Sequence, residues 1–504
     1  MVKSGLEKLV DGVQIAAVVC MQYGDTGKGK IVDLLASQWA DVIARGTGGN
    51  NAGHTVIVNE QERIYHLLPA GITYDSAGKT NVLGSGMVID PFALCHELDN
   101  LEAVGGTYNN LRISEDAGVI MPWHIESDRQ KNKSLRDGGI GSTGRGIGPA
   151  YADKTARIGI DIRDLFDRDT LAAKIKKMRE IYPGQKINTD EIIDELNPCA
   201  QKLEPFVTDT VALMHDFIRQ KKRIVLEGAQ GTLLSIEHGV KPYVTSSDSS
   251  INGTAGGVGL SAKAVDLVLG IVKFPFMTRV GGGPFVTELG GKESEEYCAA
   301  GVDHDVFYEV NTYLSGNFDL NEIKQLRERG DISEITKLTK QARLYVRNNM
   351  DKIAELMNSD NEFIQGVGIR LAADEYGATT QRPRRIGWTD AVAARYAIGI
   401  NAPLKVVLTK PDSVVGVNSF EVCFGHNYGE GKASDRFSRR VSDQRNAVPI
   451  LRHYKGFGDE IRSAESFSDL PAQFHTAIED FEGYTEAKVA MISTGPDKES
   501  TIIL

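Results

Sequence analysis

Residues 22–30 read Gln-Tyr-Gly-Asp-Thr-Gly-Lys-Gly-Lys, between the apolar run Val13–Met21 and the helix-like segment Ile31–Trp39. A strand, a glycine-rich loop and a helix in this order are typical of a phosphate-binding loop, because backbone N–H groups at the helix start face an anion. The spacing fits GxxxxGK from Gly24 to Lys30, and Lys30 would supply a positive charge to the phosphate. The loop therefore predicts an α/β fold that binds a nucleotide.

The loop departs from the usual phosphate-binding motif at two positions. Ile31 stands where a Ser or Thr usually holds Mg²⁺, and Asp25 places a carboxylate beside the expected phosphate. Such a carboxylate can ligate the Mg²⁺ of a nucleotide or act as a base on a second substrate. The alternative is a glycine-rich turn that only joins strand to helix, with Asp25 capping the helix.

A second glycine-rich stretch, residues 46–55, follows the short predicted strand Asp41–Arg45. Its glycines allow the backbone to approach a ligand closely, and His54 near its end can serve a transferring phosphoryl group as a proton donor or a cation. The alternative is a histidine that only hydrogen-bonds the turn. Loops that follow consecutive parallel strands meet at one edge of a sheet, so we expect the two loops to converge.

Three further polar stretches are candidates for ligand contact. Residues 141–149 hold four glycines, two hydroxyls and an arginine, which suits a monophosphate, although a flexible surface loop has the same composition. Residues 377–385 hold arginines whose planar forks match a carboxylate, although a basic run is usually a solvated face. After the predicted strand Leu404–Leu408, Asp412 can accept both N–H groups that guanine offers, which adenine lacks.

The composition is that of an ordinary globular protein of 504 residues, with 41% apolar and 25% charged residues. A net charge of −11 argues against a nucleic-acid partner. Five scattered cysteines without a CxxC pair favour free buried thiols over a zinc or redox centre. No apolar run approaches the roughly 20 residues that span a bilayer, so we expect a cytoplasmic protein with no membrane partner.

Hydrophobic periodicity predicts alternating strands and helices along most of the chain. The expected strands include 65–68, 81–83, 111–113, 223–227, 265–272, 404–408 and 488–492, and the expected helices include 91–101 and 389–400. Helices are also expected in 163–222, with a buried face formed by Leu171, Ile175, Met178 and Ile181. We therefore expect an α/β protein with a mainly parallel central sheet and flanking helices.

Residues 292–366 differ in character from the rest of the chain. They are charged, helix-periodic and poor in glycine loops, so we expect a helical insertion within a single domain of residues 1–504. Their apolar stripe is expected to pack against the core, and its members are Ile323, Leu326, Ile335, Leu338 and Leu344.

Together the motifs resemble those of the adenylosuccinate synthetase family. The resemblance runs from residue 13 to the C-terminus apart from the helical segment, and its motifs are GDTGKGK (24–30), GGNNAGHT (48–55), GSTGRGIGPAY (141–151), EGAQGTLL (227–234), PYVTSS (242–247), GATTQRPRR (377–385), LTKPD (408–412) and STGP (493–496). It implies a fold similar to the P-loop GTPases and the GTP-dependent ligation of IMP and L-aspartate through 6-phosphoryl-IMP, the first committed step of AMP synthesis. It also implies a homodimer and the cofactor Mg²⁺, held by Asp25 and the carbonyl of Gly53.

The same resemblance implies roles for individual residues. Asp25 would be the base at N1 of IMP and His54 the acid at the γ-phosphate, acting with Lys28 and Gln230. The residues implied for GTP are Gly24, Gly27, Lys28, Gly29, Lys30, Arg384, Lys410, Asp412, Ser493, Thr494 and Gly495. Those implied for IMP are Asp25, Asn50, Ala52, Thr143, Gln230, Thr245, Arg382 and, reaching the IMP phosphate of the partner subunit, Arg157. Those implied for L-aspartate are Thr379, Thr380, Arg382 and Arg384.

The sequence departs from the family's usual residues at Tyr23, Thr26, Thr47 and Gln381. Gln381 replaces a usual glycine, and a glutamine adopts a positive φ less easily, so the sequence alone does not determine the conformation of this loop. Two alternatives to IMP–aspartate ligation follow. One is the same chemistry on GMP or dGMP, giving a 2-amino-adenylosuccinate, and the other is a GTP-binding regulatory paralogue without turnover.

Overall fold

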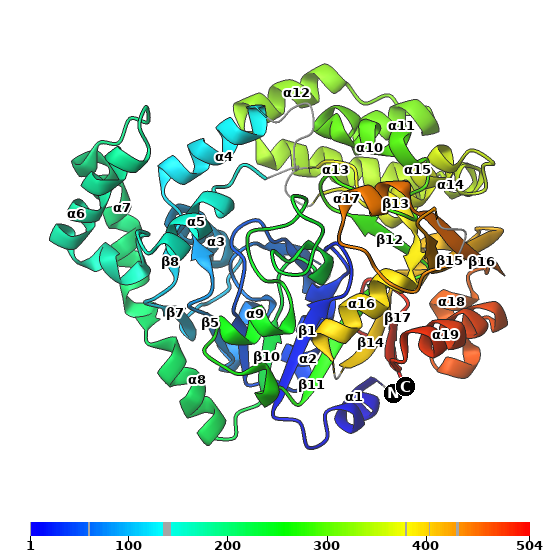
Figure 1. Ribbon diagram of the computed structural model, residues 1–504, viewed down its shortest axis with the longest axis horizontal. Coiled ribbons are helices and arrows are strands. Elements are labelled where there is room, and N and C mark those ends of the chain that lie inside the picture. The colour runs from blue at the N-terminus through cyan, green and yellow to red at the C-terminus, as the bar shows by residue number, and fades with distance from the viewer. Residues whose placement is uncertain (1, 59–60, 135–142, 378–380, 403, 430–432) are drawn as a thin grey trace.

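The computed structural model describes residues 2–58, 61–134, 143–377, 381–402, 404–429 and 433–504. At the centre of these residues lies a ten-stranded sheet (Figure 1). Its strands, in spatial order, are β18 (Thr501–Ile503), β17 (Val489–Ser493), β14 (Leu404–Thr409), β11 (Leu267–Lys273), β1 (Ile15–Cys20), β10 (Ile224–Glu227), β2 (Val42–Arg45), β5 (Thr80–Leu83), β7 (Leu111–Ser114) and β9 (Val207–Thr208). Neighbouring strands pair parallel except β17 with β18, so the predicted mainly parallel sheet is confirmed.

Strand β1 is buried along its whole length, and its side chains alternate between two hydrophobic cores. Ile15, Ala17 and Val19 pack into one core, whereas Ala16 and Val18 pack into the other, as expected for a strand covered on both faces. Helices α16 (Ala391–Asn401) and α19 (Ala472–Thr485) contribute to the first core. The second core is covered by α2 (Lys28–Gln38), α3 (Pro91–Ala103), α6 (Arg168–Ile181) and α7 (Thr189–Leu203).

A smaller mixed sheet lies beside the central one (Figure 1). Its strands, in order, are β12 (Phe276–Arg279), β13 (Arg385–Asp390), β15 (Ser419–Asn427) and β16 (Val448–Lys455). Two short pairs are β3 (His54–Val58) with β4 (Gln61–Tyr65), and β6 (Val88–Ile89) with β8 (Gly118–Val119). In the part of the chain that the structure describes, seven other helices pack around the sheets, and they are α1 (Val2–Leu9), α4 (Pro122–Ser134), α5 (Ile147–Ala156), α8 (Thr210–Arg219), α9 (Ile251–Gly256), α17 (Val441–Asn446) and α18 (Glu460–Ser463). Within the described ranges, none of the helices combines the length and apolar character needed to cross a bilayer.

The segment predicted to be helical is helical, and its helices gather along one side of the molecule (Figure 1). They are α10 (Gly291–Ala299), α11 (Val306–Leu314), α12 (Leu320–Arg329), α13 (Ile332–Arg347), α14 (Met350–Met357) and α15 (Glu362–Ala373). The predicted apolar stripe is wrong for Leu344, which is 57% exposed. The buried face of α13 is instead Thr339, Ala342 and Val346. The description of this segment as an insertion within one domain stays a prediction.

Two other local predictions are wrong. Residues 66–68 are not part of a strand, because charged side chains bind their backbone in place of a neighbouring strand. Glu97 accepts the N–H groups of all three residues, and Arg45 donates to the carbonyls of His66 and Leu67. In α6, Ile181 is 39% exposed at the end of the helix, although the other three residues of the predicted face are buried.

Candidate active site

The polar loops identified in the sequence follow neighbouring strands of the central sheet. β17, β14, β11, β1, β10 and β2 are adjacent and parallel, so their carboxyl ends lie at one edge. Ligands of α/β proteins bind at this edge. The sheet topology therefore brings the first two glycine loops together with the stretches after β10, β14 and β17.

The loop after β1 has the geometry of an anion cradle. Helix α2 begins at Lys28, and its N-cap is Gly27, which has φ 81° and no side-chain capping bond. Asp25 therefore does not cap the helix, and the first N–H groups of α2 lack acceptors within the helix. Gly29 is required because a Cβ there would lie 2.5 Å from the carbonyl oxygen of Thr55, at the second glycine loop.

The two lysines of this loop point to different places. The Lys30 ammonium donates to Ser493 Oγ at 2.7 Å, to the Gly495 carbonyl at 2.8 Å and to the Ser500 carbonyl at 2.9 Å. It is therefore engaged in the turn after β17, which the sequence assigns to guanine, and not in the cradle as the GxxxxGK spacing suggested. The Lys28 ammonium donates to the Gln230 carbonyl at 2.7 Å, which joins the loops after β1 and β10.

His54 forms a buried pair with Glu227, the last residue of β10. Its Nδ1 contacts Glu227 Oε1, and the other carboxylate oxygen accepts the N–H of Ala70 at 2.9 Å. His54 is 4% exposed and Glu227 is fully buried. His54 is therefore held by a charged side chain from another strand, whereas the alternative had this histidine bonded only to its own turn.

Electrostatics set the protonation of this pair. Burial, together with the charges of Arg45 and Lys28, holds the pKa of His54 below its ordinary value, although the Glu227 carboxylate acts to raise it. Burial also acts to raise the pKa of Glu227, but His54, Arg45 and the Ala70 N–H outweigh it and hold that pKa below its ordinary value. The carboxylate is thus ionised and accepts the proton on Nδ1. Nε2 of His54 is buried and has no partner among the described residues, so it is free to face a ligand.

Sequence reasoning missed Glu227 as part of the site. A signal was present, because a carboxylate at the end of a fully buried apolar strand needs a partner. The sequence could not show which residue that partner is, since His54 lies 173 positions away.

The loops after β2 and β10 are also joined by side chains. Gln230 has φ 49°, and its Nε2 donates to Asn51 Oδ1 at 3.1 Å. Its Oε1 is buried without a partner in the described chain, so it can accept a hydrogen bond from a ligand. Two residues of this loop are implied for IMP. The backbone carbonyl of Asn50 accepts a hydrogen bond from the Arg145 guanidinium, and the backbone carbonyl of Ala52 accepts one from His66 Nδ1 at 2.6 Å.

Asp25 pairs with Arg384 across the site, with 2.5 Å between Oδ2 and the guanidinium NH2. Burial alone would raise the pKa of Asp25, but Arg384, Lys273 and Lys28 outweigh burial and hold it below its ordinary value. Backbone contacts fix Arg384, because its N–H donates to the Glu375 carbonyl at 2.8 Å. The predicted aspartate loop thus reaches the cradle, and Asp25 is ionised.

The stretch after α15 is described only in part. Thr379 and Thr380, implied for L-aspartate, lie outside the described residues. Arg382 is exposed, and its carbonyl accepts the N–H of Gly377 at 2.8 Å. Gln381 has φ 53°, the left-handed conformation for which the family usually has glycine.

The stretch after β14, which is predicted to bind guanine, contacts a buried ionic network. The Lys410 ammonium donates to the Ala373 carbonyl at 2.9 Å and lies 3.7 Å from Glu375, which pairs with Lys273 at 2.6 Å. Thr409 Oγ1 donates to the carbonyl of Thr26 at 2.9 Å, so the strand before Asp412 is tied to the cradle. Glu375 and Lys273 carry no motif in the sequence, and they were not predicted.

The remaining residues implied for IMP lie on other elements. Thr245 is half-buried, and its N–H donates to the Leu234 carbonyl at 2.8 Å, beside the β10 loop. Thr143 is exposed in the loop between α4 and α5. Arg157 is exposed at the C-terminal end of α5, where it has φ 62°.

Comparison with known proteins shows the family of this chain. The chain matches the family model for adenylosuccinate synthetase over residues 17–502. It is 36% identical over 499 residues to the adenylosuccinate synthetase of Caldicellulosiruptor bescii, covering 97% of this chain and 99% of that one. The structure of fully ligated adenylosuccinate synthetase from Plasmodium falciparum has a TM-score of 0.78 at 28% identity, with 97% and 100% of the two chains covered. A cyanophage succinoaminodeoxyadenylate synthetase bound to dGMP and dATP shares the fold, with a TM-score of 0.51 at 18% identity and coverage of 97% and 95%. The chain belongs to the adenylosuccinate synthetase family.

Proposed function

We propose that this protein ligates IMP and L-aspartate to adenylosuccinate, using GTP and releasing GDP and phosphate. The observation that carries the proposal is the convergence of three loops. Asp25 and Lys28 follow β1, Gln230 follows β10, and His54 follows β2 and is held by Glu227. Membership of the family supports the choice of substrates.

The chemistry has two steps. The ionised Asp25 takes the proton from N1 of IMP while O6 attacks the γ-phosphorus of GTP, and the bond from that phosphorus to GDP breaks. Lys28 would stabilise charge on the transferring phosphoryl group, and His54 would do so once its Nε2 takes up a proton, which the ionised Glu227 favours. The amine of L-aspartate then attacks C6, and phosphate leaves. Phosphorylation is needed because a purine carbonyl oxygen is a poor leaving group.

The residues present fit Mg²⁺, although no ion is described. Asp25 is held ionised, and a carboxylate with the backbone carbonyl of Gly53 supplies the oxygen ligands that Mg²⁺ prefers. When bound, Mg²⁺ would neutralise charge on the GTP phosphates. We also propose a homodimer, in which the exposed Arg157 reaches the IMP phosphate of the partner subunit.

The function is tested by supplying IMP, GMP or dGMP separately with GTP, Mg²⁺ and L-aspartate. Release of GDP and phosphate, and the change in purine absorbance, are followed. We expect turnover with IMP. Turnover only with GMP or dGMP would move the function to 2-aminopurine synthesis, and no turnover with any would favour the regulatory paralogue. The guanine alternative has little other support, because the structure solved with dGMP shares only the fold.

The pairing of Arg384 with Asp25 predicts a change in pH dependence. The base must be ionised, and Arg384 lowers its pKa. In the Arg384→Gln variant that pKa rises, so the acid limb of the kcat/KM profile for IMP should move to higher pH. Arg384→Lys keeps the positive charge and is the matched control, with an acid limb close to that of the wild type. Identical acid limbs in all three proteins would contradict the pairing.

A further inference from the structure

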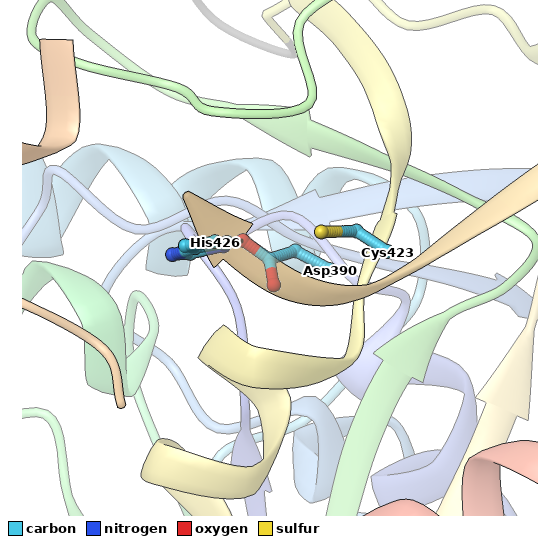
Figure 2. Close-up of side chains that lie close together, drawn as sticks. All are labelled: Asp390, Cys423 and His426. Atoms are coloured by element: carbon cyan, nitrogen blue, oxygen red, sulfur yellow. Dashed lines mark hydrogen bonds and ion pairs between the residues drawn. The ribbon is translucent and has the colours of Figure 1, made fainter. Parts of the chain in front are cut away.

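Three metal-ligating side chains meet in the smaller sheet, at the carboxyl end of β13. Asp390 ends β13 and lies opposite Cys423 in the parallel pairing with β15, which also carries His426. Figure 2 shows the Asp390 carboxyl group between the His426 ring and the Cys423 sulfur. One ligand atom from each residue lies within 4.8 Å of the others. Asp390 is 4% exposed, and Cys423 and His426 are fully buried.

The hydrogen bonds around Tyr428 decide where His426 carries its proton. Nδ1 of His426 lies 2.9 Å from the Tyr428 hydroxyl. That hydroxyl donates its single proton to the Arg436 carbonyl at 2.9 Å and accepts the N–H of Ser438 at 3.1 Å. Tyr428 therefore has no proton to offer His426, and Nδ1 must be the donor.

A proton on Nδ1 leaves a lone pair on Nε2 of the neutral ring. This nitrogen lies 2.9 Å from Asp390 Oδ2, so two electron-pair donors face each other in a buried place. The carboxylate cannot turn freely, because its Oδ1 accepts the Ala393 N–H at 3.0 Å. The arrangement requires either a proton shared by the two groups or a metal ion bound to both.

The third group favours a metal ion. Thiolate, imidazole and carboxylate together suit Zn²⁺, and the Nδ1–H bond to Tyr428 is the outer contact that metal-binding histidines usually make. We propose that Asp390, Cys423 and His426 form a structural site for Zn²⁺ that braces β13 against β15. Cys423 and His426 are three positions apart, but Asp390 lies too far away in the sequence to complete a recognisable zinc motif.

Binding must displace the proton of Cys423. Burial, and then the Asp390 charge, raises the pKa of this thiol well above its ordinary value. The thiol now donates to the Gly425 carbonyl at 3.2 Å. Metal binding releases this proton and forms the S–Zn bond, so affinity should fall as the pH is lowered. The three side chains are buried and supply three of the four ligands that Zn²⁺ takes, so the fourth would be a bound water. The proposal is independent of the ligase reaction.

The test measures metal binding by the full-length protein. Zn²⁺ content after gel filtration should be about one ion per chain, the stoichiometry of a mononuclear structural site. Co²⁺ loaded in place of Zn²⁺ should give thiolate-to-cobalt charge-transfer absorption, which requires a bond to sulfur. The Cys423→Ser variant should lose this absorption, whereas Cys199→Ser, at a half-buried cysteine of α7, should keep it.

Even if a variant fails to fold, measurements on the wild-type protein can overturn the proposal. No stoichiometric Zn²⁺, no charge-transfer absorption and no rise in Tm on adding Zn²⁺ would overturn the proposal. The cluster would then be a proton-bound pair of His426 and Asp390. Absorption that persists in Cys423→Ser would also overturn it, since the sulfur ligand would then lie elsewhere.

Discussion

Replacing Asp25 by asparagine is expected to lower kcat by about 10²- to 10⁴-fold, the range typical for loss of a general acid or base. The substitution preserves the size of the side chain but removes its charge, so N1 of IMP loses the group that takes its proton. The Arg384 guanidinium, which lies 2.5 Å from the Asp25 carboxylate, also loses its charged partner. The effect is measured as phosphate release at saturating GTP, IMP and L-aspartate.

A second aspartate on the same loop–helix unit provides the control. Asp33, in α2, accepts the Tyr74 hydroxyl at 2.8 Å, and asparagine keeps an acceptor there. Asp33→Asn should therefore retain turnover close to that of the wild type. Thermal unfolding shows whether Asp25→Asn is folded. Near-normal turnover in a folded Asp25→Asn protein would reject the role of this residue as the base.

The sequence was sufficient to predict the sheet and the edge at which the loops meet. The apolar run of β1 and the glycine loop after it are local patterns, and parallel connection of successive strands brings such loops to one edge. The stretches that contain Gln230 and Asp412 also follow apolar strands and were found in the same way. Each of these predictions needed only residues that are close together in the chain.

The direction of Lys30 and the pairing of distant groups could not be predicted from the sequence. The GxxxxGK spacing placed the phosphate charge on Lys30, but Gly27 has the left-handed conformation and α2 starts at Lys28. Lys30 is then turned towards Ser493, 463 positions away. Asp25 and Arg384, which also pair, are 359 positions apart, and no periodicity in the sequence reports such contacts.

Replacing His54 by glutamine is expected to lower kcat by about 10²- to 10⁴-fold, because an amide cannot take up and pass on the proton that Nε2 of His54 would carry to the γ-phosphate. In the structure Nε2 of His54 is free only because Glu227 accepts Nδ1–H. Glu227→Gln removes that charge but keeps an acceptor for the Ala70 N–H, which now bonds Oε2 at 2.9 Å. We expect Glu227→Gln to cost about 10- to 100-fold in kcat, with little change in the KM for IMP.

The double variant separates a positioning role for Glu227 from a general structural one. If Glu227 acts through His54, the His54→Gln, Glu227→Gln protein should be no slower than His54→Gln alone, because residues that work as a unit are non-additive. Steady-state kinetics of the four proteins give this comparison, and thermal unfolding confirms that each is folded. Losses that multiply would mean that Glu227 serves the reaction independently of His54. Since Glu227 is fully buried and its oxygens bind His54 and Ala70, we expect the non-additive result.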